Sequence, residues 1–182
     1  MEDIKPLIDY GHVDFGENKV QEAIDKWLEI KKTHKNLRLH MIGNLQSNKV
    51  KQAVNIFDYI HSLDSLKVAK KISVEQTKID KNIKIFIQVN IGEENQKNGI
   101  KLEDLKNFYS ECINNYKLDI IGLMCIPPVK IDPSSFFNKM SEVSKEFSFK
   151  ELSMGMSSDY ILATKYNTSF LRIGSKIFGE RS

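Results

Sequence analysis

Short β-rich runs alternate with longer amphipathic segments along the whole chain. Runs of β-branched and aromatic residues predict strands at residues 12–15, 37–42, 59–63, 83–91, 120–126, 151–154 and 170–173. Apolar residues at three- and four-residue spacing predict helices at 2–10, 19–33, 47–57, 66–78, 102–116 and 135–147. The pattern therefore predicts an α/β protein in which helices connect parallel strands.

The alternation alone does not distinguish a doubly wound sheet from a (β/α)8 barrel of the TIM type. Two details favour the barrel. Polar residues fall on one face near strand ends, and the last strand runs into a Gly174-Ser175 step that opens a short helix, as at the phosphate site of many such barrels. A complete barrel has eight strands in about 200 residues or more. Because the chain opens directly with a helix, we expect its first strand to be missing, and we expect residues 1–182 to form one domain.

Composition excludes several classes of protein. No apolar run approaches the roughly 18 residues that span a bilayer, and the N-terminus is charged, so we expect a cytoplasmic protein with no membrane segment. The formal charge of +3 comes from lysines scattered among acids, without interleaved aromatic residues, which argues against nucleic-acid binding. Cys112 and Cys125 form no C-x-x-C pair, so we interpret them as packed thiols and expect no metal site.

Several predicted strands carry polar residues on the face that would point into a barrel. Strand alternation places Gln88 and Asn90 together on one face, His40 on the same face as Arg38, and Arg172 on the same face as Phe170. Near the carboxyl ends of barrel strands, such groups are candidates to line a ligand site. Alternatively, they form a hydrogen-bonded polar layer inside the barrel.

A phosphate site is predicted where the last two strands end. Gly174 and Ser175 open a helix, so their backbone N–H groups are free to bind an anion. Ser157 follows the preceding strand, just after Gly155, and can donate a hydroxyl hydrogen bond. The alternative is that the glycines only form tight turns and that Ser157 only caps a helix.

Two asparagines follow the early strands. Asn18 lies in the segment Phe15-Gly16-Glu17-Asn18, and Asn48 lies in HMIGNLQSNK, which begins at His40. Both fit a site at the barrel mouth, and both equally fit turn or cap positions.

Six blocks of the sequence resemble the pyridoxal-phosphate homeostasis family. They are FGENKVQEA at 15–23, HMIGNLQSNK at 40–49, IQVNIGEENQKNGI at 87–100, GLMCIPP at 122–128, LSMGMSSD at 152–159 and LRIGSKIFGER at 171–181. The blocks occur in family order, so the resemblance covers nearly the whole chain. Members of this family are similar to the barrel domain of alanine racemase standing alone. The resemblance thus implies a (β/α)8 barrel of the alanine racemase N-terminal type that binds pyridoxal 5'-phosphate.

The resemblance also implies roles for particular residues. Ser157, Gly174 and Ser175 resemble the family's phosphate-binding group, Arg172 resembles the partner of the pyridine nitrogen, and Asn18 and His40 resemble nearby pocket residues.

The chain departs from the family at its start. Family members have a first strand that ends in a Val-Ser-Lys-Thr-like run, whose lysine forms the Schiff base with the cofactor. Met1 stands a few residues after that position, and Lys5 falls in the following helix rather than at the barrel mouth. We therefore expect no Schiff-base lysine and no catalytic residue in this chain.

Arginine opposite the pyridine nitrogen fits a carrier or a racemase better than a transaminase, because guanidinium only donates hydrogen bonds and leaves that nitrogen unprotonated. Alanine racemase adds a C-terminal β domain and a tyrosine base, whereas this chain ends at Ser182 without a paired acid and base. We therefore expect a monomeric, non-enzymatic protein for the homeostasis and delivery of vitamin B6. Its partners would be pyridoxal phosphate and the apoenzymes that receive it. The alternatives are a racemase-like pyridoxal enzyme and a truncated product that does not bind the cofactor.

Overall fold

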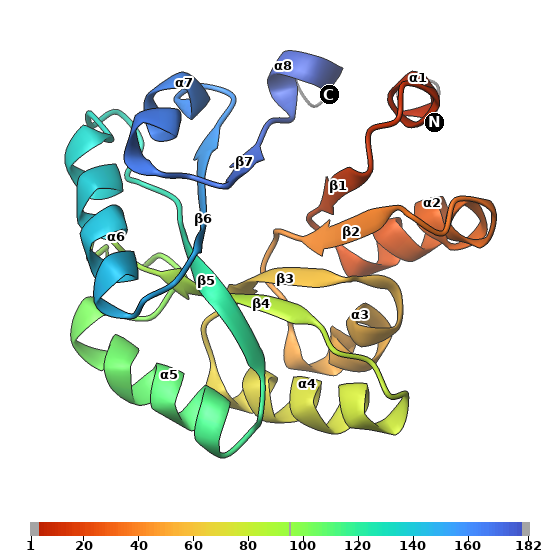
Figure 1. The fold of residues 1–182 in the computed structure, drawn as a ribbon, viewed down its shortest axis with the longest axis horizontal. Coiled ribbons are helices and arrows are strands. Elements are labelled where there is room, and N and C mark those ends of the chain that lie inside the picture. The colour runs from red at the N-terminus through yellow and green to blue at the C-terminus, as the bar shows by residue number, and fades with distance from the viewer. Residues whose placement is uncertain (1–3, 95, 180–182) are drawn as a thin grey trace.

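Seven parallel strands form one curved sheet in the computed structural model, which describes residues 4–94 and 96–179 (Figure 1). Their order in the sheet is their order in the chain: β1 (Asp14–Glu17), β2 (Arg38–Met41), β3 (Tyr59–Leu63), β4 (Lys84–Val89), β5 (Asp119–Cys125), β6 (Glu151–Met156) and β7 (Phe170–Arg172). Among the described residues no pairing joins β1 to β7, so the sheet is a barrel that is nearly closed.

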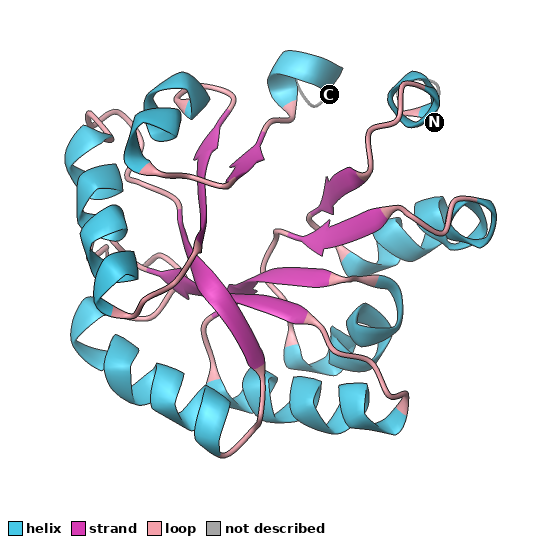
Figure 2. Ribbon diagram, in the orientation of Figure 1, coloured by secondary structure: helices cyan, strands magenta, loops and turns pink. Residues whose placement is uncertain are grey.

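Helices cover the outside of the barrel (Figure 2). They are α1 (Lys5–Asp9), α2 (Val20–Thr33), α3 (Val50–Ile56), α4 (Leu66–Lys78), α5 (Leu105–Asn114), α6 (Ser134–Glu146), α7 (Tyr160–Ala163) and α8 (Ser175–Phe178). The helices α2 to α6 bury apolar stripes that the sequence predicts, whereas α1 and α8 have no buried residue. In α2 the stripe is Val20, Ala23 and Trp27. Within the described part of the chain, no helix is long and apolar enough to cross a membrane.

Strand alternation divides the buried residues into two layers. The larger layer packs the outward side chains of the strands against the helices, for example Ile85 and Ile87 of β4. The smaller layer lies on the opposite face of the strands, inside the barrel, and is built from Tyr59, Phe86 and Met124 with Phe170 packed against them. Phe86 therefore points into the barrel, and so does Gln88 on the same face, as the alternation predicts.

Most predicted elements are confirmed, and β3 and α4 have the predicted bounds. The largest difference concerns the strand that the pattern predicts at residues 12–15. In the structure this strand is β1, and it covers Asp14–Glu17. A charged residue such as Glu17 is rarely buried. Glu17 is nevertheless buried, since Trp27 Nε1 and Lys26 Nζ both donate to its carboxylate at 2.7 Å. Glu17 thus faces the outer helices and does not belong to the barrel mouth.

Helix boundaries differ by a few residues. The predicted helices at 47–57 and 102–116 each begin with a 3₁₀ turn, Ser47–Lys49 and Leu102–Asp104. The first helix was predicted at 2–10; residues 2 and 3 lie outside the described residues, and α1 begins at Lys5. Residues 180 and 181, the last two of the 171–181 block, also lie outside the described residues.

Candidate functional site

The predicted site residues that follow strands meet at one end of the barrel. Because all seven strands are parallel, their carboxyl ends lie at the same end. Asn18 follows β1, Ser157 follows β6, and Gly174 and Ser175 follow β7. This end is where (β/α)8 barrels carry their sites.

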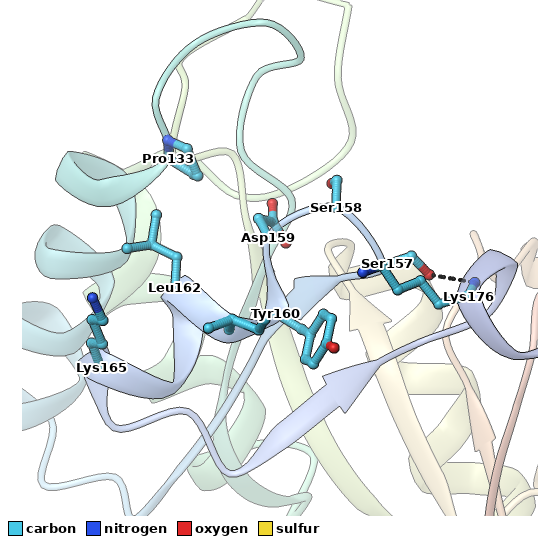
Figure 3. Close-up of a pocket in the computed structure, with 9 residues that line it drawn as sticks. Pro133, Ser157, Ser158, Asp159, Tyr160, Leu162, Lys165 and Lys176 are labelled. Carbon is cyan, nitrogen blue, oxygen red and sulfur yellow. Dashed lines mark hydrogen bonds between the residues drawn. The ribbon is translucent and has the colours of Figure 1, made fainter.

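Ser157 joins the ends of β6 and β7. Its Oγ accepts the backbone N–H of Gly174 at 3.2 Å and that of Lys176 at 3.4 Å, so the serine is linked to the first turn of α8 (Figure 3). Gly155 allows β6 to pack closely against α7, because at its φ of +91° an added Cβ would lie 2.6 Å from the Cβ of Ala163. Gly155 thus has the conformational role that the alternative assigns to it, and the Ser157 hydroxyl lies among N–H donors.

A cavity of about 350 Å³ opens beside Ser157. It is lined by the loop before α6, by α7 and by the start of α8: Pro133, Ser157, Ser158, Asp159, Tyr160, Ile161, Leu162, Lys165 and Lys176 (Figure 3). Lys176 Nζ lies 5.5 Å from the centre of the Tyr160 ring, and the Asp159 carboxylate accepts the N–H of Met156 at 2.6 Å. The cavity lining therefore carries two ammonium groups and three hydroxyls, and its carboxylate accepts a backbone hydrogen bond.

Arg172 ends β7 and points into the barrel, as its strand parity predicts. Its Nη1 donates to Ser153 Oγ at 2.7 Å and its Nη2 to the carbonyl of Cys125 at 2.8 Å. Burial lowers the pKa of this guanidinium from its usual value. The two bonds use two of its five N–H groups and fix its plane.

His40 lies deeper in the barrel than the mouth. Its ring is stacked on Tyr59 with centroids 4.3 Å apart, its Nδ1 lies 2.9 Å from His61 Nε2, and its Nε2 lies 3.0 Å from Asp14 Oδ1. Burial acts to raise the pKa of the Asp14 carboxyl, but the hydrogen bonds from His40 and Arg38 outweigh it and hold that pKa below its usual value. His40 is therefore part of a polar layer inside the barrel, the alternative that the sequence left open.

Asn18 is half-buried at the end of β1. Its backbone carbonyl oxygen lies so close to Gly43 that a Cβ added to Gly43 would be 2.2 Å from this oxygen. Gln88 and Asn90 point their amides at their own loop, towards the carbonyls of Asn98 and Glu94, at 3.3 and 2.9 Å. Asn48 is exposed in a 3₁₀ turn. The contact of Asn18 with a cofactor stays a prediction.

Sequence reasoning missed Asp14, His61 and Ser153. His61 Nδ1 lies 2.8 Å from Ser153 Oγ, and burial, followed by the nearby charges of His40 and Arg172, holds the pKa of His61 well below its ordinary value. The strand alternation that singled out His40 could have found His61, which has the parity of Tyr59 on β3. It could not have shown that Ser153, which is 92 residues away, is the partner of His61.

The two cysteines are the packed thiols that the sequence predicts. Both are free and buried, and burial raises the pKa of each to about 12. Among the described residues, no cluster of histidine, cysteine and carboxylate side chains could hold a metal ion.

Comparison with known proteins places this barrel among characterised families. Residues 2–182 match the family described as the alanine racemase N-terminal domain. The pyridoxal phosphate homeostasis protein of Aquifex aeolicus is 35% identical over 92% of this chain and 76% of its own length; that of Vibrio cholerae is 36% identical over 92% and 75%.

Solved structures agree with the sequence comparison. PipY of Synechococcus elongatus PCC7942, solved with pyridoxal phosphate bound, matches with a TM-score of 0.89 and 32% identity over 98% of this chain and 87% of PipY. An alanine racemase of Clostridium difficile 630 matches with a TM-score of 0.75 but 13% identity, over 99% of this chain and 48% of its own, which shows the fold alone. The chain thus belongs to the pyridoxal phosphate homeostasis protein family, and its barrel is that of the alanine racemase N-terminal domain.

Proposed function

We propose that this chain binds pyridoxal phosphate at the carboxyl end of the barrel and serves in the homeostasis and delivery of this cofactor. The observation that carries the proposal is the joining of the ends of β6 and β7 by Ser157, directly beside the inward-pointing Arg172. The similarity to PipY, which was solved with pyridoxal phosphate bound, supports the same conclusion.

The chemistry of the donor set fits a phosphate group. The Ser157 hydroxyl, the N–H of Ser175 at the start of α8 and the ammonium of Lys176 are all donors, whereas the Gly174 N–H, predicted to be free, is donated to Ser157 Oγ. The carboxylate in the cavity lining, that of Asp159, accepts the Met156 N–H, and the ammonium groups of Lys165 and Lys176 in the same lining offset its negative charge. A dianionic phosphate would find hydrogen-bond donors and positive charge there.

Arg172 is the residue proposed to contact the pyridine nitrogen. Guanidinium has no acceptor, so Arg172 can only donate to this nitrogen, which must then be unprotonated. When bound, pyridoxal phosphate supplies an aldehyde and an aromatic ring that can act as an electron sink, and an unprotonated ring is the weaker sink. We propose Asn18 as a further residue at the pocket.

We propose binding and delivery rather than turnover. His40 and His61 are the imidazoles inside the barrel, and both ring nitrogens of each are already engaged by protein partners. Neither is available as a general base for a substrate. Pyridoxal-dependent apoenzymes are the proposed recipients of the cofactor.

Equilibrium dialysis of the chain against pyridoxal phosphate tests the proposal. We expect Arg172→Lys to weaken binding about 10- to 150-fold, the worth of a hydrogen bond to a charged group, because lysine keeps the charge but loses the planar donor geometry. Lys139→Arg, at an exposed position of α6, is the matched control and should leave the affinity unchanged. A wild-type chain without measurable affinity at millimolar cofactor would refute the proposal.

Turnover is tested separately by chiral chromatography of L-alanine incubated with the chain and pyridoxal phosphate. We expect no D-alanine above the rate of the free cofactor. Racemisation on the order of 10 per second, an ordinary enzyme rate, would overturn the assignment as a binding protein.

A further inference from the structure

A continuous line of polar side chains crosses the inside of the barrel. It runs from Asp14 at the amino end of β1 through His40, His61 and Ser153 to Arg172 at the carboxyl end of β7. The successive distances are 3.0, 2.9, 2.8 and 2.7 Å. Five strands that are not all neighbours in the sheet thus share one hydrogen-bonded line, here named the barrel relay.

With both imidazoles neutral, the chemistry of the two ends assigns the hydrogen positions. Arg172 can only donate, so the oxygen of Ser153 accepts from it and the hydroxyl hydrogen of Ser153 is free to go to His61 Nδ1. The Asp14 carboxylate can only accept, so His40 Nε2 carries the hydrogen that points at it.

The middle link then follows. His61 Nδ1 accepts from Ser153, so the hydrogen of a neutral His61 lies on Nε2 and is donated to His40 Nδ1. In this arrangement both imidazoles are neutral, both carry their hydrogen on Nε2, and every hydrogen along the barrel relay has an acceptor within it. Protonating His40 would reverse the middle links and leave the Ser153 hydroxyl hydrogen without an acceptor in the relay.

Packing holds the relay in place. The exposed fractions of His40, His61 and Ser153 are 4%, 1% and 0%. The His40 ring is stacked on Tyr59 and the His61 ring on Phe86, each with centroids 4.3 Å apart. Little room remains for either imidazole to turn, and water cannot readily replace a missing partner.

We infer that Ser153, His61 and His40 are positioning residues that hold the Arg172 guanidinium in one orientation for the pyridine ring of the cofactor. Ser153 accepts from Arg172 through one oxygen lone pair while it donates its own hydrogen to His61, and His61 accepts that hydrogen while it donates its own to His40. The carboxylate of Asp14 is the final acceptor. This inference rests on the proposed function, because the proposed function supplies the ligand that Arg172 contacts.

The first experiment needs no cofactor. Nitrogen-15 NMR of histidine-labelled chain, with signals assigned through His40 and His61 variants, reports which ring nitrogen carries the hydrogen. We expect His40 and His61 each to be a single neutral tautomer protonated on Nε2, a signature that mere packing would not impose. A His61 protonated on Nδ1, or a mixture of tautomers, would overturn the barrel relay.

The second experiment measures the effect on binding. Ser153→Ala removes the hydroxyl beside Arg172, and we expect pyridoxal phosphate affinity to fall about 3- to 10-fold, less than for Arg172→Lys because Ser153 acts only through Arg172. It should also change the His61 tautomer signal. Ser62→Ala is the matched control: Ser62 is equally buried on β3, and its hydroxyl has no hydrogen-bond partner within the described residues, so both readouts should stay as in wild type.

The two experiments separate the inference from the function on which it rests. If wild-type chain fails to bind the cofactor, the proposed function falls, while the NMR result on the wild type still decides whether the relay exists. If wild type binds and Ser153→Ala binds equally well, the positioning role falls and the proposed function stands. Circular dichroism of each variant establishes that the barrel is folded.

Discussion

Lowering the pH should destabilise the protein through His61. Burial, followed by the charges of His40 and Arg172, holds the pKa of His61 well below the ordinary 6.5. As the pH falls through about 6.5, the unfolded chain takes up a proton at this residue and the folded chain does not. The stability contributed by the neutral, buried ring is therefore complete above the unfolded pKa and is lost as the pH falls towards the folded pKa.

The size of the effect follows from one proton. Between about pH 7.5 and about pH 5.5, an imidazole of pKa 6.5 in the unfolded state contributes about 1.4 kcal/mol to the loss of folding free energy, provided the folded state stays unprotonated. Urea m-values of about 1–3 kcal/mol per molar convert this into a shift of the unfolding midpoint of about 0.5–1.4 M.

The assay is urea unfolding at both pH values, followed by the fluorescence of Trp27, the single tryptophan, which is 1% exposed. His61→Gln removes the titration, so the variant should lose about 1.4 kcal/mol less than wild type over this range, although it starts less stable. Ser62→Ala is the control, because it changes a buried neighbour on β3 that does not titrate, and it should keep the wild-type pH dependence. Equal losses in wild type and His61→Gln would refute the assignment of His61 as a neutral buried base.

Two further predictions concern the frame of the barrel. Trp27→Phe should cost about 1.5–3 kcal/mol in urea unfolding followed by circular dichroism, because the indole N–H that donates to the buried Glu17 carboxylate is lost; a double-mutant cycle with Glu17→Gln that gave no coupling would contradict this. Gly155→Ala should cost about 1–3 kcal/mol, because φ is +91° and the new Cβ would lie 2.6 Å from that of Ala163. Gly174→Ala is its control and should cost far less, since a Cβ there meets nothing within 4 Å; equal stabilities of the two variants would count against the strain at Gly155.

Local pattern was sufficient where the residues of an element are typical of its burial: β3 is buried at every position, and α4 buries one stripe. The strand at Tyr59–Leu63 and the helix at Leu66–Lys78 have the bounds that periodicity predicts. The pattern failed at Glu17, where a buried carboxylate is stabilised by Trp27 and Lys26 from the next helix. No local rule predicts that compensation, because it depends on how α2 packs against β1.

The candidate site divides in the same way. The Gly-Ser step after β7 and the loop after β6 can be recognised in the sequence, because special backbone positions and hydroxyl donors leave a local signature. The surroundings of Arg172 cannot be recognised, because its partners are Ser153 and the carbonyl of Cys125 on two other strands. A single arginine at a strand end is compatible with many partners.

The sequence by itself determined the order of strands and helices, the parallel barrel and the family, since each depends on periodicity or on blocks of adjacent residues. It also determined which side chains, such as His40 and Arg172, face inward, because alternation is a local property of a strand. Only the tertiary structure decided that Asp14, His40, His61, Ser153 and Arg172 form one hydrogen-bonded line. His61 and Ser153 are 92 residues apart on strands that are not neighbours in the sheet, and they meet because the sheet curves round on itself. Hydrogen bonds across a barrel depend on that curvature, and no stretch of sequence encodes it alone.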